Sequence, residues 1–95
     1  MRIWVDDIRT APPGYVWCKS VNQARETILQ AEDKRVQIEL IDLDHDAGDY
    51  AADGGDYIKL LDWMAETGRK YPVRLHTANP VGRANMQRLI DRYLT

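Results

Sequence analysis

The feature that most constrains the fold is an apolar segment that ends in a dense group of charged residues. Ile38–Ile41 is apolar apart from Glu39, and Asp42–Asp46 contains three aspartates and one histidine. The pattern predicts a central β-strand over Val36–Leu43, with the charged group at its carboxyl end. Carboxylates and an imidazole in that position would lie on the rim of a sheet, where open α/β folds bind their ligands.

Two other apolar runs end in the same way. The strand expected over Arg2–Asp6 ends in a pair of acids, and the strand expected over Val73–Leu75 is followed by His76 and Thr77. The chain has two histidines, and the other one, His45, belongs to the central charged group. Because the carboxyl ends of parallel strands meet at one edge of a sheet, we expect the three ends to form one site.

Helices are expected between and after the later strands. Apolar residues repeat at steps of three and four after Ser20, Asp56 and Asn79, which are the expected N-caps. Two prolines and a glycine within residues 8–14 exclude a helix before the second strand, which is expected at Tyr15–Cys18. The predicted order is β-loop-β-α-β-α-β-α. Strands that alternate with helices indicate a parallel sheet with helices packed on its faces.

The composition indicates one globular domain over residues 1–95. With 44% hydrophobic and 29% charged residues, the chain is neither disordered nor a membrane protein, and its longest apolar runs are too short to cross a bilayer. The paired acids near the N-terminus argue against a secretory signal, and the single cysteine, Cys18, suits a reducing cytoplasm. We therefore expect a cytoplasmic protein with no membrane partner. Its small sheet would leave apolar surface that allows a homodimer.

The clustered acids favour a divalent cation. Several carboxylates at one rim repel one another, and a hard cation such as Mg²⁺, Mn²⁺ or Ca²⁺ relieves that repulsion; zinc stays an alternative. The helix expected after Asn79 would supply an anion site at its start. The two histidines are either general acid–base groups or hydrogen-bonded structural residues. Residues 47–55 are small and glycine-rich, which predicts a mobile loop able to close over a ligand.

Several motifs resemble known families. The chain resembles response-regulator receiver domains in three segments: Val5–Asp7, Ser20–Ala24 and Ile41–Asp44. A closer resemblance, to the cyclic-phosphate-processing receiver-like family, rests on the segments at the strand ends: Asp6–Arg9, Leu43–Gly48 and His76–Gly82, with Met86. It covers nearly the whole chain.

The resemblance implies a truncated receiver-like (flavodoxin-like) three-layer α/β domain. Its four-stranded parallel sheet is expected in the order 2-1-3-4, with three helices. The first helix of a receiver is replaced here by the proline-rich loop. The lysine on the fifth strand of receivers, which contacts the phosphoryl group, has no counterpart. These departures favour hydrolysis over storage of an aspartyl phosphate.

The resemblance also assigns candidate roles. It implies that Mg²⁺ or Mn²⁺ binds to the acid pair Asp6–Asp7 and to Asp44. Asp44 matches the phosphoacceptor position and is therefore also a candidate catalytic residue. Asp46 is a further candidate metal ligand. His45 and His76 are additions to the receiver pattern, and either of them could protonate a leaving oxygen. Four residues are expected to contact phosphate: Arg9, Thr77, Asn79 and Gly82.

Three functions are compatible with the sequence. The first is a metal-dependent phosphodiesterase or hydrolase that acts on the cyclic phosphate of a nucleotide or an RNA end. The second is a non-enzymatic receiver-like binding or signalling module, and the third is a phosphoacceptor receiver. The two histidines favour the first, and the missing fifth strand counts against the third. Within the rim, Asp42 is expected to be a buried, paired carboxylate.

Overall fold

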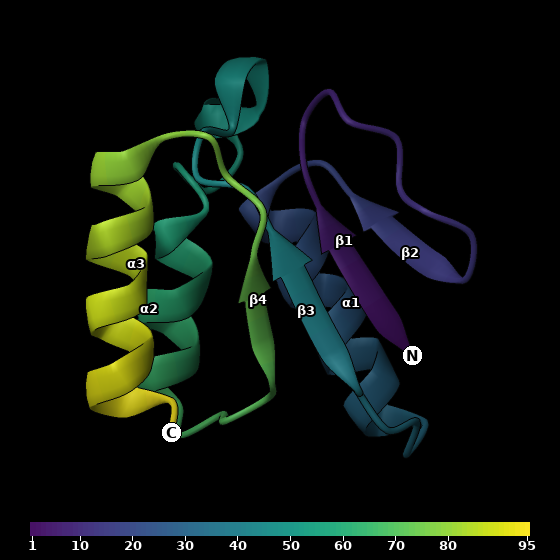
Figure 1. The fold of residues 1–95 in the computed structure, drawn as a ribbon. Coiled ribbons are helices and arrows are strands. Elements are labelled where there is room, and N and C mark those ends of the chain that lie inside the picture. The colour runs from purple at the N-terminus through teal and green to yellow at the C-terminus, as the bar shows by residue number, and fades with distance from the viewer.

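The computed structural model describes residues 1–95, and its centre is a four-stranded parallel sheet (Figure 1). The strands are β1 (Arg2–Val5), β2 (Tyr15–Cys18), β3 (Leu40–Leu43) and β4 (Val73–Leu75), in the order β2-β1-β3-β4. All three neighbouring pairs are parallel. The α/β fold class and the expected strand order are therefore confirmed.

Three α-helices complete the fold, as expected. They are α1 (Val21–Asp33), α2 (Ile58–Glu66) and α3 (Pro80–Tyr93). A short 3₁₀ helix, η1 (Gly48–Ala52), lies within residues 47–55, the segment expected to be a mobile loop. None of the helices combines the length and the apolar character needed to cross a membrane.

The starts of α1 and α3 follow from the capping residues that the sequence predicts. Ser20 Oγ accepts a hydrogen bond from the Gln23 amide at 3.0 Å. Asn79 Oδ1 accepts one from the Gly82 amide at 2.9 Å, and Pro80 occupies the first helical position. Each cap satisfies an amide that has no partner within the helix, so the local sequence fixes where both helices begin.

The prediction that Asp56 caps α2 is wrong. Tyr57 occupies the N-cap position, and no side chain caps this helix. The Asp56 carboxylate instead accepts a hydrogen bond from the Ala47 amide at 3.0 Å. This bond ties the start of α2 to the segment that follows β3, so the carboxylate serves the site-forming loop rather than the helix.

The central strand is shorter than the predicted Val36–Leu43. It begins at Leu40, which lies opposite Arg2, the first residue of β1. The residues before Leu40 extend beyond the start of β1, and two hydrogen bonds of 2.8 Å join them to Met1: the Glu39 amide donates to Met1 O, and the Met1 amino group donates to Gln37 O. The apolar pattern therefore predicted the strand's end correctly but not its beginning, which depends on the length of its neighbour.

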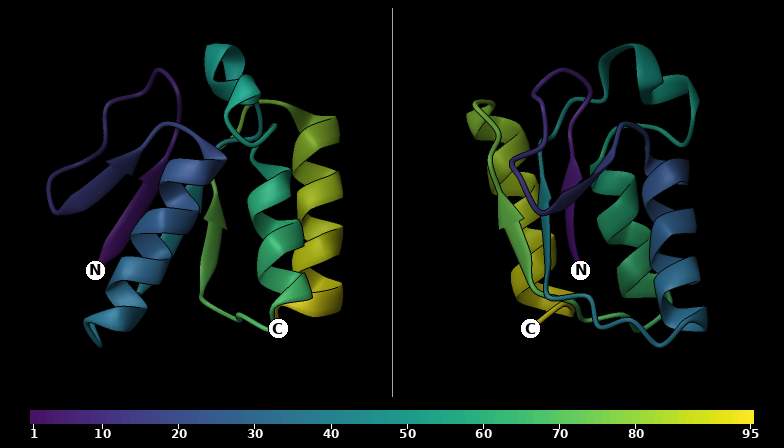
Figure 2. Two further views of the ribbon diagram at one scale, coloured as in Figure 1. Left: turned by 180° about the vertical axis from the view of Figure 1, so that it is seen from behind. Right: turned by 90° about the vertical axis from the view of Figure 1, so that its right-hand side faces the viewer.

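Helices cover only one face of β1 and β3 (Figures 1 and 2). In Figure 1, α1 lies behind the sheet, and α3 lies beside β4 and packs against α2. Ile3 and Val5 are fully buried on the covered face, whereas Trp4, between them, is partly exposed on the other. The expected third layer is not formed over these strands, because a proline-rich loop follows β1 where a helix would have covered that face.

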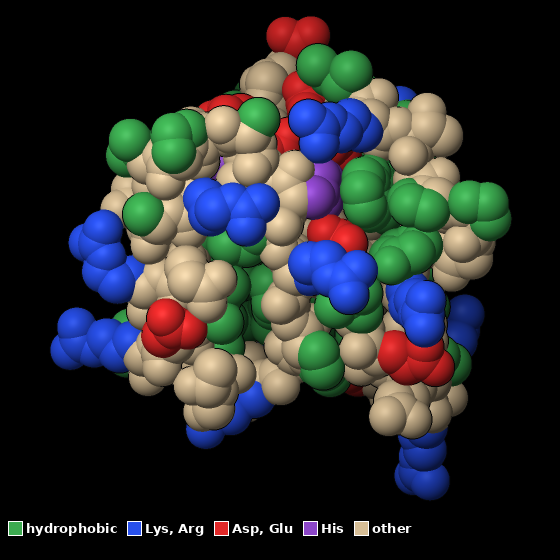
Figure 3. All heavy atoms as spheres, viewed as in Figure 1, with side chains coloured by type: hydrophobic (Ala, Val, Ile, Leu, Met, Phe, Trp, Pro, Cys, Tyr) green, Lys and Arg blue, Asp and Glu red, His purple; other side chains and the backbone are tan.

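The uncovered face carries aromatic and charged side chains. Trp4 lies beside Trp17 and Asp42 in neighbouring strands, and Asp42 lies beside Arg74. Figure 3 views this face and shows Lys and Arg side chains around a partly visible histidine. The charged groups that follow β1, β3 and β4 lie at the carboxyl end of this face.

Candidate functional site

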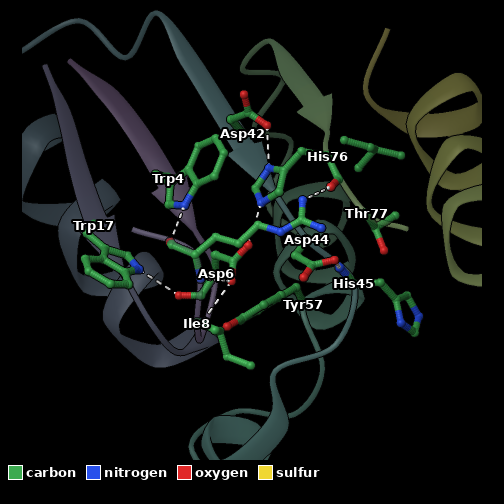
Figure 4. Close-up of polar contacts among 12 residues, drawn as sticks. Trp4, Asp6, Ile8, Trp17, Asp42, Asp44, His45, Tyr57, His76 and Thr77 are labelled. Carbon is green, nitrogen blue, oxygen red and sulfur yellow. Dashed lines mark hydrogen bonds and ion pairs between the residues drawn. The ribbon is translucent and has the colours of Figure 1, made fainter. Parts of the chain in front are cut away.

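The carboxyl ends of β1, β3 and β4 lie side by side (Figure 4). The parallel pairing continues one residue past the strands: the Asp44 amide donates to Val5 O at 3.0 Å, and the His76 amide donates to Leu43 O at 3.1 Å. The Asp6 amide, after β1, donates to Cys18 O at 3.2 Å. The residues that follow the three strands are thus held at fixed positions by backbone hydrogen bonds.

Three carboxylates meet at this edge. One ligand oxygen each from Asp6, Asp7 and Asp44 lies within 4.8 Å of the other two, which is close enough for one divalent cation to contact all three. We call these three residues the acidic cluster. Asp46 lies outside it, because its side chain is 62% exposed and pairs with His45 Nδ1 at 2.8 Å. The role of Asp46 as a metal ligand stays a prediction.

The three carboxylates of the acidic cluster repel one another. Burial raises the pKa of Asp7 above its ordinary value, and the neighbouring carboxylates add to the effect. Burial also acts to raise the pKa of Asp6, but hydrogen bonds from the Ile8 and Arg9 amides, both 2.9 Å, and from His76 outweigh it, so this pKa is lowered. Asp6 is therefore firmly ionised, and the repulsion is felt by Asp7.

The acidic cluster fits a hard divalent cation. Its donors are carboxylate oxygens, which Mg²⁺ and Mn²⁺ prefer. Burial is the main cause of the raised pKa of Asp7, and a cation would remove the smaller part that comes from repulsion by Asp6 and Asp44. Gly48, at the start of η1, closes against the cluster with φ of +55°. A Cβ at that position would lie 2.3 Å from Asp7 Oδ2, so a side chain there would displace the Asp7 carboxylate.

His76 bridges two carboxylates (Figure 4). Its Nε2 lies 2.8 Å from Asp6 Oδ2, and its Nδ1 lies 2.7 Å from Asp42 Oδ1. The ring stacks on Trp4 with a centroid separation of 3.9 Å and an interplanar angle of 5°. Asp42 is 4% exposed, so the expectation of a buried, paired carboxylate is confirmed, and His76 is its partner.

His45 is held by different contacts. Its amide donates to Asp44 Oδ1 at 2.7 Å, and its Nδ1 pairs with Asp46. In Figure 4 the ring is directed away from the acidic cluster, and it packs against the start of α3, where a Cβ on Gly82 would lie 2.4 Å from its Cγ. His45 and His76 therefore lie on either side of Asp44 in this view. A common catalytic role for them stays a prediction.

The four predicted phosphate contacts are already engaged within the protein. Arg9 Nη1 donates to His76 O at 3.1 Å, which holds the guanidinium over the site. Thr77 is buried, and its Oγ1 accepts from the Asn79 amide at 3.1 Å. The Gly82 amide donates its hydrogen bond to Asn79 Oδ1 in the N-cap of α3. These contacts place all four residues around the strand ends, and their binding of phosphate stays a prediction.

Two residues at the site were missed by sequence reasoning. Trp4 belongs to the strand expected over Arg2–Asp6, in a sheet expected to have helices on its faces, yet its ring supports the His76 ring on the uncovered face. Gly48 was interpreted only as part of a loop. Its position directly after a charged strand end, two residues beyond Asp46, is the one signal that could have suggested a close backbone approach.

Nearly the whole chain matches one family model. The model, described as the cyclic-phosphate processing Receiver domain, matches residues 1–92. The matched part includes the acidic cluster and both histidines. No curated protein and no solved structure matches the chain.

Proposed function

Because this chain belongs to the cyclic-phosphate processing receiver domain family, we propose that it is a metal-dependent phosphodiesterase or hydrolase. Its substrate would be the cyclic phosphate of a nucleotide or an RNA end. The observation that carries the proposal is the acidic cluster, whose ligand oxygens lie within 4.8 Å of one another at the carboxyl edge of the sheet. This is the edge where parallel α/β sheets bind ligands.

The acidic cluster would hold Mg²⁺ or Mn²⁺. When bound, the cation supplies charge neutralisation for the phosphate oxygens and lowers the pKa of water. Asp6 and Asp44, whose carboxylates accept hydrogen bonds from backbone amides, would hold the cation at the strand ends, and the cation would bind the phosphate there. Arg9 and Thr77 lie beside that position and would contact the remaining phosphate oxygens.

Opening a cyclic phosphate also requires a proton for the leaving oxygen. His45 suits this role better than His76. Its Nδ1 is held by Asp46 and its Nε2 has no hydrogen-bond partner in the protein, whereas both ring nitrogens of His76 face carboxylates. We therefore assign proton donation to His45 Nε2, with Asp46 holding Nδ1. Because the ring is directed away from the acidic cluster and towards α3, the leaving oxygen would lie on the α3 side of Asp44.

The test is hydrolysis of a panel of 2′,3′-cyclic nucleotides, 3′,5′-cyclic nucleotides and RNA with a cyclic phosphate end. We expect turnover with Mg²⁺ or Mn²⁺ and none with a chelator. Asp44→Asn should reduce turnover to background, and His45→Ala should reduce it by about 10²–10⁴-fold, the usual contribution of a general acid. Asp33→Asn, on the exposed end of α1, is the matched control and should leave turnover unchanged.

A non-enzymatic receiver-like module is the second candidate. The observation that favours it is that no hollow in the surface lies at the acidic cluster. The hollows lie along α1, along α3, between α2 and α3, and near Trp17. Metal binding without turnover on any member of the panel would support this module. Labelling of Asp44 by acetyl phosphate, again without turnover, would support a phosphoacceptor receiver instead.

A further inference from the structure

The bridge from Asp42 through His76 to Asp6 links the sheet interior to the acidic cluster. Asp42 lies within β3 and is 4% exposed, although every other residue of that strand is apolar. A buried carboxylate is costly unless it is hydrogen-bonded, and His76 Nδ1 is the one hydrogen-bond partner of this side chain. The polar residue in the strand is therefore explained by the histidine that it holds.

The orientation of the His76 ring is fixed on three sides. Asp42 and Asp6 contact its two nitrogens, and Trp4 covers one face of the ring. The His76 side chain is 12% exposed. The ring cannot turn without losing a hydrogen bond in the buried part of the site, so its contact with Asp6 is set by Asp42.

The contacts of Asp6 leave little freedom for a cation. A carboxylate has about four acceptor sites, two on each oxygen. Oδ1 accepts from the Ile8 and Arg9 amides, and Oδ2 accepts from His76, so three sites are used. The remaining site is on Oδ2, the atom that His76 contacts. The position of the imidazole thus decides which direction on Oδ2 is left for a metal.

We propose that Asp42 is a positioning residue for metal binding, which acts through His76 on Asp6. It holds the imidazole so that the free acceptor site of Asp6 Oδ2 faces the point shared with Asp7 and Asp44. The inference rests on the proposed metal site and adds to it a residue that does not contact the metal. Partners of this kind fix the geometry of metal ligands, and their loss commonly lowers metal affinity by about 10–100-fold.

The test is calorimetric titration of Mg²⁺ and of Mn²⁺ into the protein without substrate. Asp42→Leu removes the acceptor for His76 Nδ1 and should weaken both metals at least about 10-fold. Asp42→Asn keeps an oxygen at that position and should weaken them much less. This rescue separates positioning from a purely structural role, because both variants remove the buried charge.

Ile41→Val is the matched control for stability. Ile41 is fully buried in the same strand, so its truncation lowers the free energy of unfolding without touching the bridge, and metal affinity should stay unchanged. If Asp42→Leu does not fold, His76→Gln replaces it. Glutamine can still hydrogen-bond Asp6 but not Asp42 at the same time, so the same loss of metal affinity is expected.

The outcomes are distinct. Wild-type affinity in Asp42→Leu or in His76→Gln overturns the positioning role and leaves the proposed metal site intact. Equal losses in Asp42→Leu and Ile41→Val would also overturn it, because general destabilisation would then explain the effect. Failure of the wild-type protein to bind either metal overturns both the proposed function and this inference.

Discussion

At the scale of single residues, two glycines determine how closely the backbone approaches the site. Gly82 is expected to contact phosphate, which stays a prediction. The structure shows a different role, because the missing side chain leaves room for the His45 ring. Gly48 similarly lets η1 close on Asp7. Neither steric role is visible in the sequence, because a glycine in a loop or a first helical turn has many explanations. Both roles follow from the short distances between these glycines and the side chains of His45 and Asp7.

Gly82→Ala should separate activity from stability. The added Cβ would lie 2.4 Å from His45 Cγ and must displace the ring. A misplacement of about 1 Å commonly costs about 100-fold in turnover, whereas alanine in a helix is favoured over glycine by about 1 kcal/mol. We expect a large loss of cyclic-phosphate hydrolysis with little loss of thermal stability. Asn85→Ala, on the exposed side of the same helix, should leave hydrolysis unchanged. Full activity in Gly82→Ala would contradict the role given to His45.

Gly48→Ala should weaken metal binding, and Gly14→Ala provides its control. Both glycines have positive φ, +55° and +86°, so each substitution introduces backbone strain of about 1–2 kcal/mol. A Cβ at Gly14 meets nothing within 4 Å, whereas one at Gly48 would collide with Asp7 Oδ2. Denaturant unfolding should show similar destabilisation in both variants, and titration with Mg²⁺ should show weaker binding in Gly48→Ala alone. Equal affinities would mean that the loop does not position Asp7.

At the scale of secondary-structure elements, polar side chains join segments that the hydrophobic pattern leaves unconnected. Glu32, near the end of α1, accepts two hydrogen bonds of 2.9 Å from Arg69 and one from Tyr71. Arg69 also lies over the Trp63 ring of α2. The segment before β4 is thereby attached to two helices. The sequence predicted these helices and β4, but nothing in it indicated which side chains join them.

The Glu32 contact should make stability depend on pH. Hydrogen bonds from Arg69 and Tyr71 hold the pKa of Glu32 below its ordinary value of 4.5. A lowered pKa in the folded state contributes stability that is complete above the unfolded pKa and is lost as the pH falls through the folded pKa. Glu32→Gln should therefore lower the free energy of unfolding at pH 7, by about 0.5–1 kcal/mol because the pair is partly exposed, and the difference from wild type should shrink below about pH 4.

Urea unfolding at pH 7 and at pH 3.5 measures this difference, and the exposed Glu66→Gln is the control. The bond between Glu32 and Tyr71 should also make stability depend on pH in the alkaline range. Burial, and then the bond to Glu32, raises the pKa of Tyr71 to about 12, so its contribution should be lost as the pH rises from about 10 towards that value. A constant difference between wild type and Glu32→Gln across the acid range would contradict this account.

At the scale of the whole molecule, the sheet topology brings together residues that are far apart in the chain. The sequence predicted which strand ends carry charge, and the rule for parallel sheets predicted that they meet. Asp6, Asp7 and Asp44 follow from this reasoning. The bond between Asp42 and His76 does not, because it depends on the pairing of β3 with β4 and on which face each side chain occupies. The uncovered face of β1 and β3 was predictable only in part. The sequence indicates that a proline-rich loop replaces the first receiver helix, but element order alone does not say which face of the sheet the remaining helices cover.

Metal binding should stabilise the entire domain. A ligand that binds only the folded state at 100 times its Kd adds about 2.7 kcal/mol to the free energy of unfolding. For a domain of this size each kcal/mol raises the melting temperature by about 4–8 °C, so Mg²⁺ at that concentration should raise it by roughly 10–20 °C. Asp44→Asn should melt higher than wild type without metal, because it relieves the repulsion on Asp7, and should gain little from Mg²⁺. Asp33→Asn should respond as wild type does. An equal rise in wild type and Asp44→Asn would identify a general salt effect and contradict a site built from the three strand ends.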